Sequence, residues 1–454
     1  MKSHAGEGGK YFARYAEPEV ALANAVSERY LASLVVPVCG EAPSLLDGFQ
    51  SALARAPERA LLILVVNATD AASDAIHAEN QRVLTHLSQL FPTAHAITHE
   101  GVTTRAWLGH AEHYDLLWLD RASLGVRLPP REGVGLARKL GGDVAAALWA
   151  RGQLRCPLLA MSDADVTLPA DYFLRLSEPV AESSPSAAWL WPYRHEPGGD
   201  GAIDAATVLY EISLRYYVLG LAAAGSSYAY QSVGSTLCVA APAYLSVRGV
   251  PKREAAEDFH LLDKLAKVGP LRRPALTPIG IRARASERVP FGTGRRSREI
   301  AQELSCGEEF LLYSPRVFLA LAAVLEGLST FAESADVAAL ERAVALRLPE
   351  LAEPIQRVLS DLGVFAALTS AAGQAPPGAI LRRRIHTWFD SLRTLRFVHR
   401  LRDASLSSMP WRAALAAAPF LSDPFARGRE PEAVCRVLAR VEAELPIQVG
   451  PSLL

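Results

Sequence analysis

The sequence is poor in cysteine, and the cysteines that it has are dispersed. No two of the five form a C-x-x-C pair; they are Cys39, Cys156, Cys238, Cys306 and Cys435. An odd, scattered set argues against a disulfide framework and against a zinc site. We therefore expect a protein of a reducing compartment.

The chain also lacks a net charge and a long apolar run. Its 47 lysines and arginines balance 48 aspartates and glutamates, so nothing global attracts nucleic acid or an acidic membrane. The N-terminal segment has no apolar core of the signal-peptide kind. An uncharged run of about 18 residues would be needed to span a bilayer, but Glu211 and Arg215 interrupt 205–225, and 317–328 is too short. These absences favour a soluble cytoplasmic protein without a nucleic-acid partner.

What is present is ordinary for a globular protein of two or three domains. Half of the 454 residues are hydrophobic and 21% are charged. In the first half, apolar runs alternate with helical patterns. We expect strands at 31–38, 61–66, 94–98 and 115–119, and helices at 44–56, 73–90 and 133–150. Such alternation predicts a parallel sheet with right-handed crossovers.

The pattern changes further along the chain. Strands are expected at 187–193, 232–240 and 276–285, with helices at 204–224 and 257–268, and strand signals then disappear. We therefore divide the chain into a leader with a short helix (1–30, the helix at 21–30), an α/β domain (31–296) and a helical region (297–454).

A pair of aspartates follows the apolar run 157–161. Asp163 and Asp165 form a D-A-D motif directly after this run, which has the length of a buried strand. Ligands of open α/β sheets bind beyond the carboxyl ends of the strands, and one or two carboxylates can hold Mg²⁺ together with substrate phosphates. The alternative is a solvated turn before a helix at Pro169.

Further motifs stand in order around this pair. The first strand ends in V-P-V-C-G-E, the second ends in a turn from Asn67 to Asp70, and Glu257-Asp258 opens a helix in A-A-E-D-F-H-L-L-D-K-L. In this order and spacing, residues 31–296 resemble the GT-A glycosyltransferases of the family 2 type. The resemblance implies an α/β GT-A fold, Rossmann-like with a mostly parallel sheet flanked by helices, to which 297–454 adds an all-helical region.

The resemblance also implies a ligand set. A UDP- or GDP-linked nucleotide sugar would be the donor, a hydroxyl group the acceptor, and Mn²⁺ or Mg²⁺ the cofactor. Asp165 would bind the metal, with Asp163 beside it reaching the ribose or a metal-bound water. Base and ribose would be contacted by Pro37, Val38, Glu41, Asn67 and Asp70. The alternative for the Asn67–Asp70 segment is a plain Asx or ST turn.

Basic residues near these motifs are candidates for the nucleotide. Arg138 and Lys139 precede the D-A-D strand. The loop 288–296 carries Arg288 and Arg295 on either side of two glycines, so that it could close over a diphosphate. The alternatives are a solvated helix face for the first pair and an interdomain linker for the loop.

Asp258 is our candidate general base, with Glu257 beside it. An inverting transferase needs a carboxylate to take the acceptor's proton. A helix N-terminus favours the ionised form, so we expect a lowered pKa for Asp258. His260 is a candidate third metal ligand, by resemblance to some retaining GT-A enzymes. Alternatively, Glu257 and Asp258 are only favourable first-turn acids.

The predicted function is transfer of a single sugar by an inverting enzyme. The Q-x-x-R-W motif of processive members and transmembrane helices are missing, which favours non-processive transfer. A retaining transferase with a histidine ligand is one alternative. A sugar nucleotidyltransferase is another, although C-G-E-A-P replaces the glycine-rich loop expected after its first strand. A catalytically silent protein with a helical interaction module is the third.

The segment 381–403 is basic and amphipathic. One helical face would carry Leu381, Ile385, Trp388, Phe389, Leu392 and Leu395, with arginines opposite. Such a helix can lie on the inner face of an anionic membrane, which would suit a lipid-linked acceptor. Alternatively, it packs its apolar face into its own domain.

Overall fold

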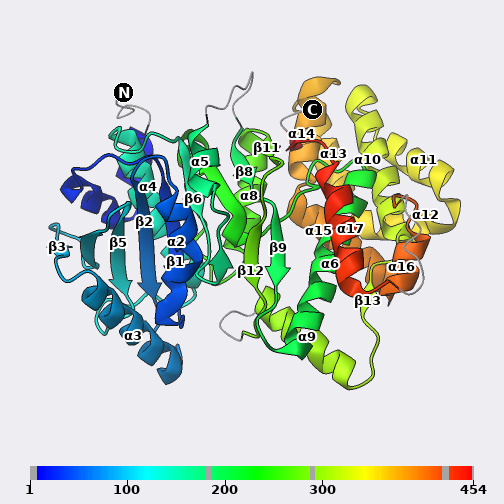
Figure 1. Ribbon diagram of the computed structural model, residues 1–454. Helices are drawn as coiled ribbons and strands as arrows, with labels where there is room; N and C mark the ends of the chain where they lie inside the picture. Colours follow the sequence, from blue (N-terminus) through cyan, green and yellow to red (C-terminus); the bar gives the residue numbers. More distant parts are fainter. Residues whose placement is uncertain (1–7, 179–185, 287–291, 422–428, 452–454) are drawn as a thin grey trace. The chain divides into compact units, whose positions relative to one another are not determined.

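The computed structural model describes residues 8–178, 186–286, 292–421 and 429–451. The chain forms two compact units (Figure 1). The first comprises residues 1–198 and 232–295, and the second comprises residues 199–231 and 296–454.

The first unit is built on a large central sheet, in the order β11-β8-β10-β6-β1-β2-β5-β4-β3. The strands are β1 (Ser33–Val38), β2 (Ala60–Asn67), β3 (His95–Ile97), β4 (Arg105–His110), β5 (Tyr114–Arg121), β6 (Leu158–Met161), β8 (Ala188–Leu190), β10 (Leu237–Ala240) and β11 (Leu271–Arg272). The central strands β6, β1, β2 and β5 run parallel, whereas β10, β4 and β3 pair antiparallel with their neighbours. The fold is therefore α/β and compatible with a Rossmann-like arrangement. The strand β4 was not predicted.

The centre of the sheet is buried because helices cover it. Every residue of β1 and β2 is buried, as expected for apolar parallel strands. The helix α4 (Gly133–Ala150) packs against β1, β2 and β6 (Figure 1). At Gly141 a Cβ atom would lie 2.4 Å from Val35 Cγ1, so glycine allows the helix to approach the sheet closely.

The other helices of this unit are shorter, apart from α3. They are α2 (Asp47–Ala54), α3 (Asp74–Leu90), α5 (Tyr172–Ser177), α7 (Ala241–Ser246) and α8 (Glu257–Val268). A second, small sheet in the order β7-β12-β9 consists of β7 (Val166–Thr167), β12 (Ile279–Arg282) and β9 (Tyr193–Glu196). Because β7 directly follows the D-A-D motif, this sheet brings residues near 282 to the two aspartates.

The N-terminal segment is part of the first unit. It contains α1 (Gly9–Arg14) and a 3₁₀ helix at Pro18–Ala25 that packs on α4, instead of the helix predicted at 21–30. Tyr11 donates a hydrogen bond to the fully buried carboxylate of Asp143 on α4. Asp143 also accepts from Tyr244 Oη at 2.7 Å, Lys139 Nζ at 3.0 Å and the Glu17 amide at 2.8 Å.

The second unit is mainly helical, and it includes a helix that we had assigned to the α/β domain. Its helices are α6 (Gly201–Ala223), α9 (Thr293–Ser305), α10 (Arg316–Ser334), α11 (Ala338–Arg347), α12 (Ala352–Asp361), α13 (Val364–Ala372), α14 (Ala379–Trp388), α15 (Ser391–Ala404), α16 (Trp411–Ala417) and α17 (Pro431–Ala443). The helix α6 packs against α17 and α10, because apolar residues such as Ile212 and Tyr216 join the core of this unit. The buried Arg215 of α6 pairs with Glu211 and with Glu442 of α17 at 2.6 Å each.

Two further details differ from the predicted division. The helix α9 runs across the boundary placed at residue 296. The short strands β13 (Leu311–Leu312) and β14 (Met409–Pro410) form an antiparallel pair, so the region after 297 is not wholly helical.

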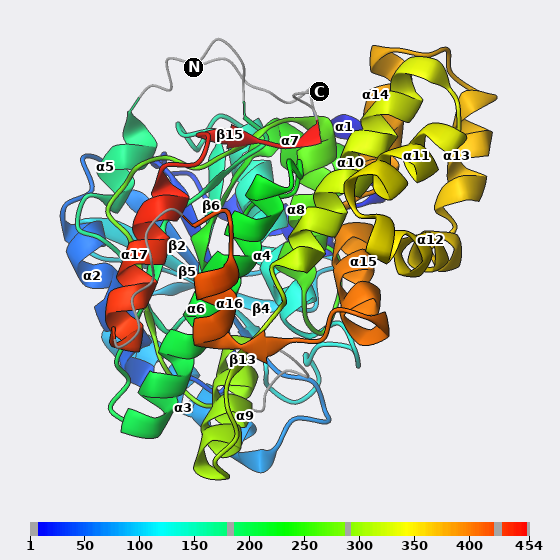
Figure 2. The same ribbon diagram turned by 90° about the vertical axis from the view of Figure 1, so that its right-hand side faces the viewer.

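The helix α10 is longer than the apolar run 317–328. Its 19 residues are long and apolar enough to cross a membrane, and 61% of the relevant window is buried inside the structure. Figure 2 shows α10 with α11 and α14 around it. A core helix of a soluble protein has the same properties, so this feature alone is weak support for a membrane span.

The segment 381–403 is not one continuous amphipathic helix. It divides between α14 and α15, where Asp390 caps α15 by accepting from the Arg393 amide at 3.1 Å. The apolar residues Leu381 and Ile385 of α14, and Phe389 directly after it, lie in the core of the second unit. In α15 the buried face is made by Thr394, Phe397, Val398 and Leu401 rather than by Leu392 and Leu395. The predicted apolar face is thus used inside its own unit.

We predict that Tyr11→Phe destabilises the protein. The substitution removes one of the donors to a buried carboxylate, which costs about 1–3 kcal/mol. Urea unfolding at pH 7 measures this change. Tyr15→Phe is the matched control, because no hydrogen bond from the Tyr15 hydroxyl is found among the described residues. Equal stability of Tyr11→Phe and the wild type would contradict the prediction.

Candidate functional site

The strand order reverses its direction between β1 and β6. From β1 the chain continues outward to β2 and β5 on one side, whereas β6 lies on the other side. In open α/β sheets such a switch point leaves a crevice at the carboxyl ends of the strands, where ligands bind. Here the residues after β1, including Glu41, and those after β6, including Asp163 and Asp165, come to this point.

One buried arginine joins three segments of the chain at the switch point. Arg138 of α4 contacts Asp163 Oδ1 through Nη2 at 2.7 Å and Glu257 Oε1 through Nε at 3.2 Å. Its Nη1 donates to the carbonyl oxygens of Ser162 at 3.2 Å and Gly234 at 3.1 Å. Only 2% of the Arg138 side chain is exposed. A charge this deeply buried needs such partners, and it ties α8 to the end of β6.

Gly234 leaves room for this arrangement. A Cβ atom at this position would lie 2.8 Å from Arg138 Nη2 and 3.5 Å from Asp258 Oδ2. Arg138 and Asp258 therefore border the same small space, and a Cβ atom at position 234 would push on Arg138.

A second arginine holds the other aspartate. Arg284 contacts Asp165 Oδ2 through Nε at 2.5 Å and Glu41 Oε1 through Nη2 at 2.9 Å. The antiparallel pairing of β12 with β7 brings it there, and the Arg282 amide donates to the Asp165 carbonyl at 3.0 Å. Arg284 was not among the residues predicted from the sequence, where only the nearby Arg288 and Arg295 were considered.

Asp258 lies at the start of α8, next to Glu257. The residue before this helix, Ala256, has φ = 57°, and such left-handed backbone is strained for a residue other than glycine. Burial, and after it the charge of the neighbouring Glu257, raise the pKa of Asp258 to about 7. The lowered pKa that we expected from the helix N-terminus is therefore wrong. Burial and the charge of Glu257 raise the pKa of Asp258 by more than the hydrogen bond from the Phe259 amide, at 2.7 Å, lowers it.

Glu41 has a similar environment. The pKa of Glu41 is raised to about 8, chiefly by burial; Arg284 opposes the rise, and the charges of Asp165 and Asp163 contribute to it. Asp163 also raises the pKa of Asp258. The carboxylates thus influence one another and form one electrostatic cluster.

The cluster contains more acidic than basic groups. Five carboxyl groups (Glu41, Asp163, Asp165, Glu257 and Asp258) face two guanidinium groups (Arg138 and Arg284), a formal balance of 2 − 5 = −3 when all are ionised. Each aspartate of the D-A-D motif uses one oxygen for its arginine. Since Mg²⁺ needs only one or two protein carboxylates when substrate phosphates complete its shell, these residues fit a divalent cation.

His260 does not form a metal-binding group with Asp163 and Asp165 in this structure. Among the described residues, no group of three or more His, Cys, Asp and Glu side chains is placed to hold a metal ion. A site with Asp163, Asp165 and His260 as three protein ligands is therefore not formed in this structure.

Other predicted residues lie elsewhere or have structural partners. Lys139 points to the buried Asp143 rather than to the switch point. The Asn67 side chain donates to the carbonyls of Val38 and Val65 and so ties the ends of β1 and β2 together. Asp70 is exposed and pairs with Arg127 at 3.0 Å.

The remaining predictions concern β1 and the basic loop. Pro37 and Val38 are the last two residues of β1, and both are buried. Arg288 lies outside the described residues. Arg295 is in α9, and none of the contacts described for the cluster involves it.

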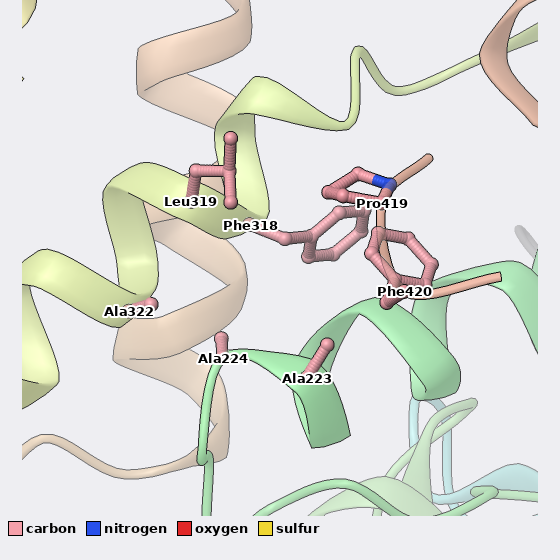
Figure 3. Close-up of a pocket in the computed structure, with 7 residues that line it drawn as sticks. All are labelled: Ala223, Ala224, Phe318, Leu319, Ala322, Pro419 and Phe420. Carbon is pink, nitrogen blue, oxygen red and sulfur yellow. The ribbon is translucent and has the colours of Figure 1, made fainter. Parts of the chain in front are cut away.

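A separate cavity of about 210 Å³ lies in the second unit (Figure 3). It is lined by Ala223, Ala224, Phe318, Leu319, Ala322, Pro419 and Phe420. These residues are apolar, and none of them belongs to the carboxylate cluster. The cavity therefore has no group for acid–base chemistry or metal binding.

Comparison with known proteins adds no relative. The chain matches no protein-family model, and no curated protein matches it. The functional inference must therefore come from the geometry of the cluster.

We predict that Asp258→Asn raises thermal stability at alkaline but not at acid pH. The folded-state pKa of about 7 lies above the ordinary 3.8, so the native state binds this proton more tightly than the unfolded state. The contribution of Asp258 to stability therefore falls as pH rises from about 4 through about 7. Asparagine does not ionise, so the variant does not lose stability in this way.

Melting temperatures from pH 4 to pH 9, measured with EDTA present, test this. The difference between Asp258→Asn and the wild type should be smallest at pH 4 and reach a plateau above pH 7. The surface variant Asp70→Asn serves as the control. A difference independent of pH would count against a raised pKa at Asp258.

Proposed function

We propose that this protein is a metal-dependent glycosyltransferase of GT-A type that transfers one sugar from a nucleotide-sugar donor to a hydroxyl acceptor. The observation that supports this most is the gathering of Asp163, Asp165 and Asp258 with two arginines at the switch point of the sheet. These residues are far apart in the sequence, and a site for a phosphorylated ligand is expected at this place in the fold.

The two acids at the start of α8 have different roles in this proposal. Glu257 is paired with Arg138 and is buried, so it orients the arginine. Asp258 is the general base. The acceptor oxygen bonds to the anomeric carbon, its proton passes to the Asp258 carboxylate, and the bond between the anomeric carbon and the diphosphate oxygen breaks. A base with a pKa of about 7 is well matched to proton transfer near neutral pH.

Asp163 and Asp165 would hold Mn²⁺ or Mg²⁺. The cation, when bound, would stabilise negative charge on the departing diphosphate. Direct attack by the acceptor inverts the anomeric centre, so we propose an inverting, non-processive transferase. The donor would be UDP- or GDP-linked. The enzyme would act in the cytoplasm, and nucleic acid would not be a partner.

We predict that Asp165→Asn and Asp258→Asn each lower turnover by about a hundredfold or more, since a general base alone contributes about 10²–10⁴ in rate. Hydrolysis of UDP- and GDP-sugars, and transfer to a panel of hydroxyl acceptors, measure this with Mn²⁺ or Mg²⁺. Asp165→Asn should also weaken Mn²⁺-dependent nucleotide binding, whereas Asp258→Asn should not.

Asp361→Asn is the matched control, because it removes an aspartate of α12 that is exposed and lies outside the cluster. It should keep wild-type activity. The proposal fails if the wild type binds and hydrolyses no nucleotide sugar, which would favour a silent protein. It also fails if Asp165→Asn keeps normal metal-dependent binding. NMR of the product's anomeric proton distinguishes inversion from retention.

A further inference from the structure

The two arginines of the cluster differ in their access to solvent. The Arg138 side chain is 2% exposed and contacts two carboxylates and two backbone carbonyls. The Arg284 side chain is 30% exposed and contacts two carboxylates. Arg138 is thus enclosed by protein acceptors, whereas Arg284 lies where a ligand can reach it.

The contacts of Arg284 leave part of its guanidinium group available. Asp165 takes Nε and Glu41 takes Nη2, and no described residue accepts from Nη1. A guanidinium group has five N–H donors in a rigid, planar arrangement. The carboxylates on two of its nitrogens therefore hold the group in place and orient the remaining donors.

An anionic ligand needs such a group at this place. When ionised, the carboxyl groups of Glu41, Asp163, Asp165 and Asp258 at the switch point repel a diphosphate. A divalent cation offsets part of this repulsion. Arg284 supplies a further positive charge that does not depend on the metal, and arginine binds phosphate oxygens through paired N–H donors.

We propose that Arg284 is a binding residue for the diphosphate of the nucleotide donor. The inference rests on the proposed function, and it goes beyond it by assigning the diphosphate to a residue on β12's C-terminal extension rather than to the loop 288–296. Arg284 reaches this position only because β12 pairs with β7 next to the D-A-D motif. The position of β12 therefore places the Arg284 guanidinium group beside the carboxylates that follow β1 and β6.

Calorimetric titration of UDP and GDP tests the assignment, with and without Mg²⁺. Arg284→Gln should bind both at least tenfold more weakly than the wild type under both conditions, and its affinity for uridine and guanosine should not change. Arg284→Lys keeps the positive charge but lacks the planar set of donors. Its affinity for UDP and GDP should lie between those of Arg284→Gln and the wild type. Arg282→Gln is the matched control, because Arg282 is exposed on the same strand, and it should bind as the wild type does.

The folding of Arg284→Gln needs its own control, since the substitution leaves Glu41 and Asp165 without their cation. The double variant Glu41→Gln, Arg284→Gln removes one of the two carboxylates that Arg284 contacts. It should recover thermal stability relative to Arg284→Gln, while nucleoside diphosphate binding should stay at least tenfold below the wild type. Recovery of binding together with stability would overturn the proposal.

Inorganic pyrophosphate separates this inference from the proposed function. If the wild type binds neither nucleoside diphosphate, the transferase proposal fails, and pyrophosphate then tests Arg284 alone. Weaker pyrophosphate binding by Arg284→Gln than by the wild type supports the assignment. Equal affinity of the two proteins for UDP, GDP or pyrophosphate overturns it, and so does a wild type that binds none of the three.

Discussion

The arrangement of the cluster depends on the buried guanidinium group of Arg138. A charge removed from water is costly unless its partners compensate for it, and Arg138 has partners in the segment after β6, in the turn at Gly234 and in α8. No two of these segments adjoin in the sequence. The need to satisfy one cation therefore fixes where Asp163 lies relative to the start of α8, and the position of Asp258 follows from it.

The same cluster shows how neighbouring acids acquire different properties. Glu257 has a direct partner in Arg138, whereas the hydrogen bond found for the Asp258 side chain among the described residues comes from the Phe259 amide, and the charge of Glu257 lies beside it. Burial raises the pKa of both acids, but the arginine opposes this rise most directly at Glu257. One member of the pair thus serves the structure, and the other is left with the proton affinity that acid–base chemistry requires.

Local patterns predicted much of the α/β unit. The helices α4 and α8 have the predicted bounds, because their apolar periodicity and first-turn acids are local signals. The strands β1, β2 and β6 are apolar runs and were found to within two residues. The strand β4 was missed because its sequence R-A-W-L-G-H contains glycine and charged or polar ends.

The parts that were not predicted depend on contacts between distant residues. Arg284 has no motif around it, and only the pairing of β12 with β7 brings it to Asp165. In the sequence, Arg138 and Lys139 look like one basic pair. Successive residues of a helix face different directions, however, so Arg138 contacts Asp163 and Lys139 contacts Asp143. Likewise, α6 is apolar on most sides, so its sequence did not indicate which of the two units would bury it.

The adjacency of Arg138 and Lys139 on α4 links two distant parts of the first unit. Lys139 and Asp143 hold Tyr11 and the amide of Glu17, while Arg138, one position earlier, holds Asp163. The N-terminal segment is therefore hydrogen-bonded to the same helix that holds Asp163 through Arg138. A shortened protein that begins after Tyr11 would keep every residue of the cluster but lose the hydrogen bonds that Tyr11 makes with α4.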